Sequence, residues 1–353
     1  MTTTPVIVRA DGSQTLGIGN ITRSLAIAEV FQEQGAEIIY AARDLDPRVK
    51  QLVEAMHCTY APLPARMSVE EDIERTRALI ASSGASFCII DLGNPEATHD
   101  VRQYSRCLQG YASAARLIIA DDLTRATFPR GVVVNPNTEV TEQDYDTHFA
   151  PRFLFGPRYA ILRSFYRNAA GTRTFTDGPP GRVAISLGGG AVASTLLDEV
   201  IRGVRLALGT KVELEIVTSI AEAGRLETSR ILRDFARVSV LSNLPSLREV
   251  LQRVDVAVVS GGVTKYEAAA TATPMLIVPS IDHQESWGAS FARTGAALYG
   301  GNVDQISAET LAPICAAVAD VAVRRRLGLR GAELVDGHGA SRIVEAAAAL
   351  VRT

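Results

Sequence analysis

Residues 256–267 read Val-Ala-Val-Val-Ser-Gly-Gly-Val-Thr-Lys-Tyr-Glu. Much of the chain repeats the same order of an apolar run, a turn and a helical segment. The four apolar residues 256–259 form the kind of run that parallel strands show when helices cover both faces of the sheet. The Ser-Gly-Gly sequence at 260–262 favours a tight turn, and the residues from Thr264 onwards are typical of a helix start. This order of strand, turn and helix predicts an α/β protein with a parallel sheet.

Short β-branched runs alternate with helical segments in two blocks. The segment 21–34, for example, carries the apolar spacing of a helix and is followed by the helix-stopping Gly35. The expected strands are 6–8, 38–40, 87–90, 117–119 and 132–134 in the first block, and 183–186, 214–217, 238–240, 256–259 and 275–278 in the second.

Residues 171–181 lack apolar periodicity and are rich in turn formers, so we expect a domain boundary there. The sequence therefore predicts two doubly wound, Rossmann-like α/β domains that face each other across a cleft. The expected division is residues 1–170, a linker at 171–181, and residues 182–353. Ligands of such sheets bind at the carboxyl ends of the strands.

Composition narrows the class of protein. The 353 residues suffice for two domains with their own cores, and 36 basic against 39 acidic residues show no excess typical of nucleic-acid binding. No apolar run reaches the roughly 18 residues of a membrane-spanning helix, and the N-terminus does not resemble a signal peptide. The cysteines match neither zinc pairs nor a disulfide framework; they are Cys58, Cys88, Cys107 and Cys315. We expect a cytoplasmic protein without nucleic-acid partners or a membrane span, and the oligomeric state is left open.

Glycine-rich turns follow three of the expected strands. They contain Gly17 and Gly19 in the first block, and Gly188, Gly189, Gly190, Gly261 and Gly262 in the second. Three consecutive glycines cost chain entropy, so the turn at 188–190 suits a backbone-lined pocket for a phosphate or diphosphate. The glycines of the first block could equally serve only to turn the chain from strand to helix.

Polar side chains accompany the turns of the second block. Ser260 and Thr264 place hydroxyls beside the expected helix start. Glu267, one turn into that helix, could complement the helix dipole or accept hydrogen bonds from two ribose hydroxyls. His283 and Gln284 lie in a polar loop after the last strong strand, where a ligand is expected.

Taken in order, these motifs resemble a known group of enzymes. The motifs are R-x-D-G-S-x-x-x-G-x-G-N-x-x-R over 9–23, the three glycines, S-G-G-x-T-x-Y-E over 260–267, and a later His-Gln pair. They are similar to the GT-B nucleotide-sugar enzymes, most of all to the UDP-sugar hydrolases of the pseudaminic-acid pathway and their spore-coat polysaccharide relatives. That family in turn resembles the MurG-type glycosyltransferases. The resemblance extends from Arg9 to Arg342.

The resemblance implies a role for each motif. Residues 188–190 and 260–264 would cradle the diphosphate of a nucleotide sugar, Glu267 would hold the ribose, and the loop around His283 and Gln284 would meet the sugar. Residues 17–20 would close the opposite wall. The N-terminal domain would then be the acceptor and catalytic side, and the C-terminal domain would bind the nucleotide sugar.

The chain departs from the hydrolases at two positions. Their general base is a histidine, and this chain has Asn20, whose amide can orient a group but cannot take a proton. They also carry an aromatic hydroxyl two residues beyond Asp91, where this chain has Gly93. Asp11 and Asp91 are the candidates for a replacement base, although either could serve a structural role, Asp11 as a turn cap.

Three functions follow from these residues. The leading one is a glycosyltransferase that cleaves the anomeric C–O–phosphate bond of a nucleotide sugar, with a UDP-sugar as the expected donor, and passes the sugar to an unknown acceptor. The alternatives are a UDP-sugar hydrolase with a replaced base and a non-catalytic nucleotide-sugar-binding protein. No group of His, Cys, Asp and Glu has metal-ligand spacing, so we expect neither a metal nor a cofactor.

Overall fold

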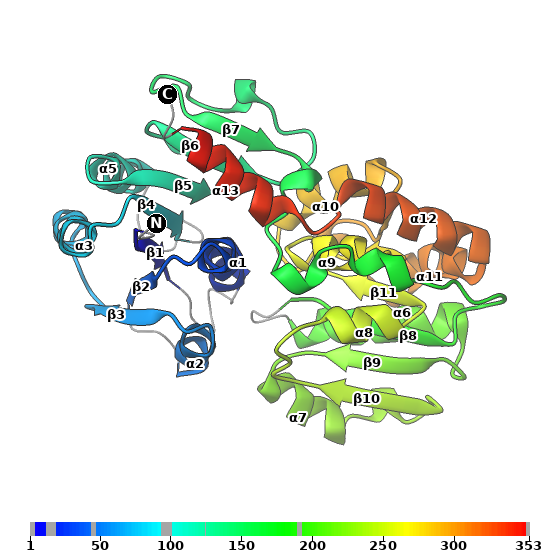
Figure 1. Cartoon of the computed structure of the whole chain (residues 1–353). Coiled ribbons are helices and arrows are strands. Elements are labelled where there is room, and N and C mark those ends of the chain that lie inside the picture. The colour runs from blue at the N-terminus through cyan, green and yellow to red at the C-terminus, as the bar shows by residue number, and fades with distance from the viewer. Residues whose placement is uncertain are drawn as a thin grey trace. The chain divides into compact units, whose positions relative to one another are not determined.

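The computed structural model describes residues 4–11, 19–43, 47–92, 101–123, 125–188 and 193–350. The chain forms two compact units, which are treated one at a time below. Unit 1 comprises Met1–Ser164 together with Gly337–Thr353, and unit 2 comprises Phe165–Asp336 (Figure 1). Gly17, Gly93, Gly189 and Gly190 lie outside the described residues.

Unit 1 is built on a parallel sheet that has seven strands within the described residues. Their order across the sheet is β3 (Thr59–Leu63), β2 (Ile38–Arg43), β1 (Val6–Ala10), β4 (Phe87–Asp91), β5 (Arg116–Ala120), β6 (Gly131–Asn135) and β7 (Arg152–Phe155). Because β1 lies inside the sheet and the strand order grows outwards from it in both directions, the sheet is doubly wound.

Helices cover both faces of this sheet. They are α1 (Gly19–Glu33), α2 (Pro47–Ala55), α3 (Val69–Ser83), α5 (Val101–Ala112) and α13 (Gly339–Ala349). Val6 and Val8 of β1 pack in one core with α1 and α13, whereas Ile7 packs in the opposite core with α3 and α5. Alternate residues of one strand are therefore buried on opposite faces, which explains the continuous apolar runs of the sequence.

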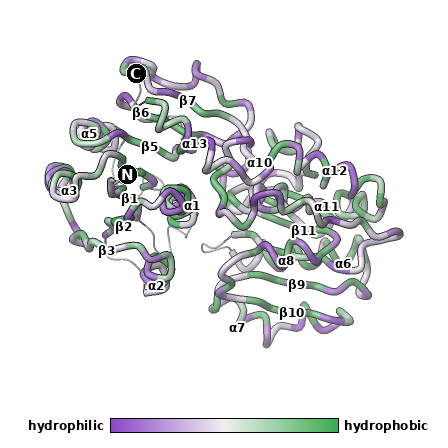
Figure 2. Tube along the Cα trace, in the orientation of Figure 1, coloured by the Kyte–Doolittle hydropathy of each residue, from purple (hydrophilic) through white to green (hydrophobic). Residues whose placement is uncertain are grey.

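Unit 2 repeats the design with a parallel sheet that has six strands in the part of the chain that the structure describes. The order is β10 (Arg237–Leu241), β9 (Glu213–Val217), β8 (Arg182–Ser186), β11 (Val256–Val259), β12 (Met275–Ile277) and β13 (Leu298–Tyr299). Its helices are α6 (Ser194–Leu208), α7 (Ile220–Thr228), α8 (Arg248–Arg253), α9 (Thr264–Ala270), α10 (His283–Arg293), α11 (Ala308–Ala316) and α12 (Val321–Leu334). Figure 2 shows hydrophobic stretches coinciding with strands such as β9. The two sheets confirm the predicted pair of doubly wound α/β domains.

The C-terminal helix differs from the expected division at 182–353. Helix α13 packs against α1, β5 and β6 of unit 1, as the red helix in Figure 1 shows. Its apolar stripe of Ala340, Ile343, Val344 and Ala347 is buried in the core of that unit. The sequence shows the apolar stripe but not the core against which it packs. The sequence alone therefore places this helix with residues 182–353.

The segment 171–181 also differs from the expected linker, because it is fastened to unit 2. The guanidinium of Arg173 donates to the backbone oxygens of Leu251 at 2.9 Å and Val254 at 2.7 Å. Arg324 donates to the backbone oxygens of Thr176 and Gly178, both at 2.7 Å. The turn-forming residues of this segment therefore make an ordered surface loop that Arg173 and Arg324 hold in place. Local composition cannot reveal contacts between residues so far apart in the sequence.

Candidate functional site

In unit 2, the adjacent strands β8, β11 and β12 end at one edge of the sheet. Ser260 follows β11, and its amide donates to the oxygen of Ser186 over 3.2 Å. Gly188 follows β8 with a φ of +110°, and a Cβ at that position would lie 3.5 Å from Ser260 Oγ. The structure thus brings together two of the three glycine turns that the sequence singled out.

The Ser-Gly-Gly turn lies directly against Gln284. A Cβ on Gly261 would lie only 2.6 Å from the backbone oxygen of Gln284, so the close packing requires glycine. On the side-chain amide, Oε1 accepts from the backbone N and from Oγ of Ser280, both at 3.1 Å. A Cβ on Gly262 would lie 3.4 Å from Nε2 of that amide. Gln284 is thereby held in one orientation beside the turn, as its predicted place at this edge requires.

Lys265 is buried behind the same turn and is not among the site residues predicted from the sequence. Its ammonium donates to the backbone oxygen of Gly261 at 2.5 Å and to that of Gly262 at 3.3 Å. Nζ also lies 4.2 Å from the ring centre of Tyr266. Only the Lys-Tyr-Glu order within 265–267 could have signalled this, and sequence order does not say which way a side chain turns.

Glu267 lies on α9, where the phenol of Tyr166 donates to Oε1 over 2.9 Å. Burial raises the pKa of Glu267 to about 7, with the hydrogen bond from Tyr166 acting in the opposite direction. Burial, together with the carboxylate charge nearby, raises the pKa of Tyr166 well above its usual value, so the phenol stays protonated and donates. Glu267 is therefore a carboxyl whose charge changes near neutral pH. Tyr166 is a second residue that the sequence reading did not single out.

The segment around His283 differs from the expected polar loop. Helix α10 begins at His283, whose ring packs on Trp287 with centroids 4.7 Å apart. Thr264 begins α9 and is buried. Both residues follow the carboxyl ends of their strands, and of the two only His283 differs from its predicted local conformation, because it begins a helix.

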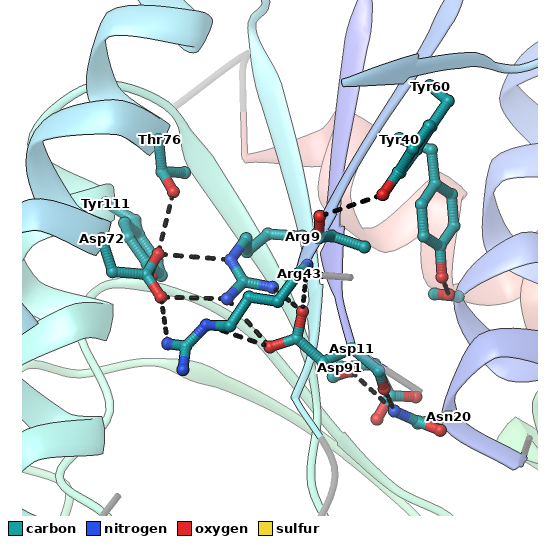
Figure 3. Close-up of polar contacts among 12 residues, drawn as sticks. Arg9, Asp11, Asn20, Tyr40, Arg43, Tyr60, Asp72, Thr76, Asp91 and Tyr111 are labelled. Atoms are coloured by element: carbon teal, nitrogen blue, oxygen red, sulfur yellow. Dashed lines mark hydrogen bonds and ion pairs between the residues drawn. The ribbon is translucent and has the colours of Figure 1, made fainter. Parts of the chain in front are cut away.

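In unit 1, the ends of β1 and β4 are joined by Asn20 (Figure 3). Gly19 and Asn20 are the first two residues of α1. The side-chain amide of Asn20 donates to the backbone oxygen of Asp11 and, at 3.5 Å, to that of Asp91. The hydrogens of this amide are thus donated to backbone oxygens, and the orienting role of Asn20 stays a prediction.

Asp11 belongs to a buried network of charges. Arg9 donates to both of its carboxylate oxygens, at 2.6 and 2.9 Å, and the amide of Arg43 donates to Oδ1 at 2.8 Å. Arg9 also makes two hydrogen bonds to Asp72 of α3, which accepts further ones from Arg43 at 2.5 Å and Tyr111 at 2.7 Å. Figure 3 shows Asp72 and Asp11 on either side of the Arg9 guanidinium.

Asp91 forms an ion pair with Arg23. Arg23 on α1 donates to its two carboxylate oxygens, each at 2.9 Å, and to Asp122 at 2.5 Å. Both candidate bases, Asp11 and Asp91, therefore have oxygens occupied by guanidinium donors, a geometry that orients each carboxylate. The general-base role of either residue stays a prediction.

Among the described residues, no group of three or more His, Cys, Asp and Glu side chains is arranged to hold a metal ion. Over the same ranges, no helix has the length and apolar character needed to cross a bilayer.

Comparison with known proteins identifies the fold. No protein-family model matches the chain. It is similar to the spore coat polysaccharide biosynthesis protein SpsG of Bacillus subtilis (strain 168), with 33% identity over 95 residues, or 27% of this chain and 28% of that protein. The match thus spans little more than a quarter of the relative's length.

Similarity to solved structures extends over nearly the whole chain. MurG of Acinetobacter baumannii superposes with a TM-score of 0.67 at 12% identity, over 97% of this chain and 99% of MurG. The spinosyn rhamnosyltransferase SpnG, complexed with thymidine diphosphate, has a TM-score of 0.61 at 17% identity, over 97% of this chain and 100% of SpnG. The chain therefore has the GT-B fold, which confirms at the level of fold the resemblance drawn from the motifs.

Proposed function

We propose that the chain is a glycosyltransferase that uses a nucleoside-diphosphate sugar, with a UDP-sugar as the expected donor. The reaction breaks the bond between the anomeric carbon and the phosphate oxygen, and an acceptor hydroxyl takes the sugar. The observation that carries the proposal is the edge of unit 2, where Gly188, the Ser-Gly-Gly turn and Gln284 meet in a GT-B fold.

The turn offers hydrogen-bond donors to a diphosphate. The backbone amides of Gly262 and Val263 donate to none of the residues that the structure describes. Successive free amides in a glycine turn form a concave anion site. Charge grows on the diphosphate as its bond to the sugar breaks, so donors fixed beforehand stabilise the leaving group in the transition state.

Glu267 supplies an acceptor for the nucleoside. When ionised it is acceptor-only and can take two hydroxyl hydrogens, which matches the pair on a ribose. Tyr166 already donates to one of its oxygens and fixes the orientation of the carboxyl. We assign the ribose contact to Glu267 and the sugar contact to the segment that contains His283 and Gln284.

We assign the acceptor chemistry to unit 1. Transfer requires a base for the acceptor hydroxyl, and Asn20 cannot supply it. Asp11 and Asp91 follow or end adjacent strands, and the Asn20 amide ties their backbone together. One of these carboxylates would take the proton in the proposed reaction.

The proposal is tested by incubating the protein with UDP-, TDP-, CDP- and GDP-sugars, with and without hydroxyl-bearing acceptors. We expect little nucleotide release from the donor alone and a sugar-acceptor product, detected by mass spectrometry, when an acceptor is added. Rapid, stoichiometric release of nucleoside diphosphate and free sugar without an acceptor would instead identify a hydrolase. Binding with no turnover under any condition would identify a nucleotide-sugar-binding protein.

A further inference from the structure

Lys265 places a buried positive charge directly behind the Ser-Gly-Gly turn. It is one of only three lysines in the chain, and it is 1% exposed. Its Nζ reaches two consecutive backbone oxygens, those of Gly261 and Gly262, at 2.5 and 3.3 Å. One ammonium thus draws two successive carbonyl groups of the turn to the same side.

Peptide geometry determines where the amides of the turn must then point. In a planar trans peptide the N–H lies opposite the C=O. When the carbonyl of Gly261 faces Lys265, the amide of Gly262 faces away from it, and the carbonyl of Gly262 fixes the amide of Val263 in the same way. These are the amides that donate to no described residue. A cation on the carbonyl side also polarises each peptide group, which strengthens the hydrogen bond that its N–H can donate.

The surroundings of Lys265 hold the ammonium in place. Its Nζ lies 4.2 Å from the ring centre of Tyr266 and 5.9 Å from that of Trp287. Aromatic faces attract a cation and offset part of its lost hydration. Gln284 also packs closely against Gly261, so Lys265 and Gln284 both confine the turn.

We infer that Lys265 is a positioning residue for the diphosphate: it orients the amides of Gly262 and Val263 towards the phosphates without touching the ligand. The inference rests on the proposed use of a nucleoside-diphosphate sugar. It attributes the anion affinity of the turn to the orientation that Lys265 gives to these two amides.

The test compares Lys265→Met with the wild-type protein. Calorimetry first identifies which of UDP, TDP, CDP and GDP binds the wild type most tightly. The ratio of its affinity to that of the matching nucleoside monophosphate then measures the contribution of the second phosphate. We expect Lys265→Met to lower this ratio about tenfold, a loss typical of a hydrogen bond to a charged group. The exposed Lys211→Met, which carries the same loss of charge, should leave the ratio unchanged.

A folded Lys265→Met protein with the wild-type ratio would overturn the inference and leave the proposed function standing. If no diphosphate binds the wild type, the proposed function fails and the inference falls with it. A second measurement does not depend on the variant folding. In the wild type, the diphosphate should move the amide proton resonances of Gly262 and Val263 downfield in ¹⁵N-resolved spectra, and unmoved resonances at saturation would overturn the assignment.

Discussion

Glu267 combines a partly buried carboxyl with a hydrogen bond from the phenol of Tyr166. Burial raises its pKa to about 7, so the group is divided between two forms near neutral pH. Only the ionised form accepts hydrogen bonds with both oxygens. A ligand that presents two hydroxyls should therefore bind better as the pH rises through 7.

This reasoning gives a prediction for Glu267→Gln. We expect the ratio of wild-type to variant affinity for the tightest nucleoside diphosphate to reach about tenfold near pH 8 and to fall towards one near pH 6. Titration of the ligand's own phosphate affects both proteins and cancels in the ratio. Calorimetry over this range measures the effect, and the exposed Glu309→Gln serves as control. A ratio that does not vary with pH would exclude Glu267 as the titrating contact.

A second prediction tests whether Asp11 or Asp91 acts as the base. If Asp91 or Asp11 removes the acceptor proton, its change to Asn lowers kcat by about 100-fold or more and leaves donor affinity unchanged. Steady-state kinetics with donor and acceptor would show this, with the exposed Asp177→Asn as control. Full turnover in both Asp11→Asn and Asp91→Asn would remove both residues from the reaction.

Sequence reasoning found part of the candidate site and missed another part. Ser260, Gly188 and Gln284 are predictable at one edge because each follows a recognisable strand, and the carboxyl ends of parallel strands lie at the same edge of a sheet. Lys265 and Tyr166 were missed because their importance lies in the direction of a side chain. Arg9 and Asp72 contact each other although 63 positions separate them in the sequence, and no local sequence pattern predicts such a pair.

At the scale of elements, an ion pair between Arg9 and Asp72 links β1 to α3. Asp72 is fully buried between Arg9 and Arg43. Burial alone would raise its pKa, but the ion pair with Arg9, together with hydrogen bonds from Arg9, Tyr111 and Arg43, holds it well below the usual range. The stabilisation is present above the unfolded-state pKa and is lost as the pH falls through the lower folded-state value.

Asp72→Asn should accordingly destabilise the protein by about 3 kcal/mol or more, because it leaves the guanidinium groups of Arg9 and Arg43 with Asp11 as their shared counter-charge in place of two carboxylates. Urea unfolding at neutral pH measures this loss. Glu74→Gln, an exposed change on the same helix, should stay within about 0.5 kcal/mol. Equal stability of the two variants would show that the buried network contributes little.

Other elements show where the sequence pattern was weak. The strand expected at 256–259 is β11, with the same bounds. The edge strand β3 was missed because it is partly exposed and contains Pro62, which lowers the strand signal. The other edge strand, β7, is short and only partly apolar. Buried inner strands are thus readable from one sequence, whereas among the edge strands of the two described sheets only β10 is predicted, by the run at 238–240.

At the scale of the whole molecule, the chain returns to its first unit at the end. Ile343 of α13 is fully buried in the core of unit 1. Ile343→Ala should cost about 2 to 5 kcal/mol and increase hydrogen exchange in β5 and β6. Val204→Ala on α6, in the core of unit 2, should instead increase exchange in unit 2. Faster exchange in β8 and β9 caused by the α13 variant would contradict the division into these units.

The central claim is that the edge of unit 2 binds a nucleoside diphosphate through its glycine turn. Calorimetry on the wild type, Gly261→Ala and Gly224→Ala tests it most directly. A Cβ at Gly261 would meet the Gln284 backbone at 2.6 Å, whereas one at Gly224 on α7 meets nothing within 4 Å. We predict saturable binding of at least one of UDP, TDP, CDP and GDP, weakened about tenfold or more by Gly261→Ala and unchanged by Gly224→Ala. No binding by the wild type, or equal binding by a folded Gly261→Ala protein, would contradict the account.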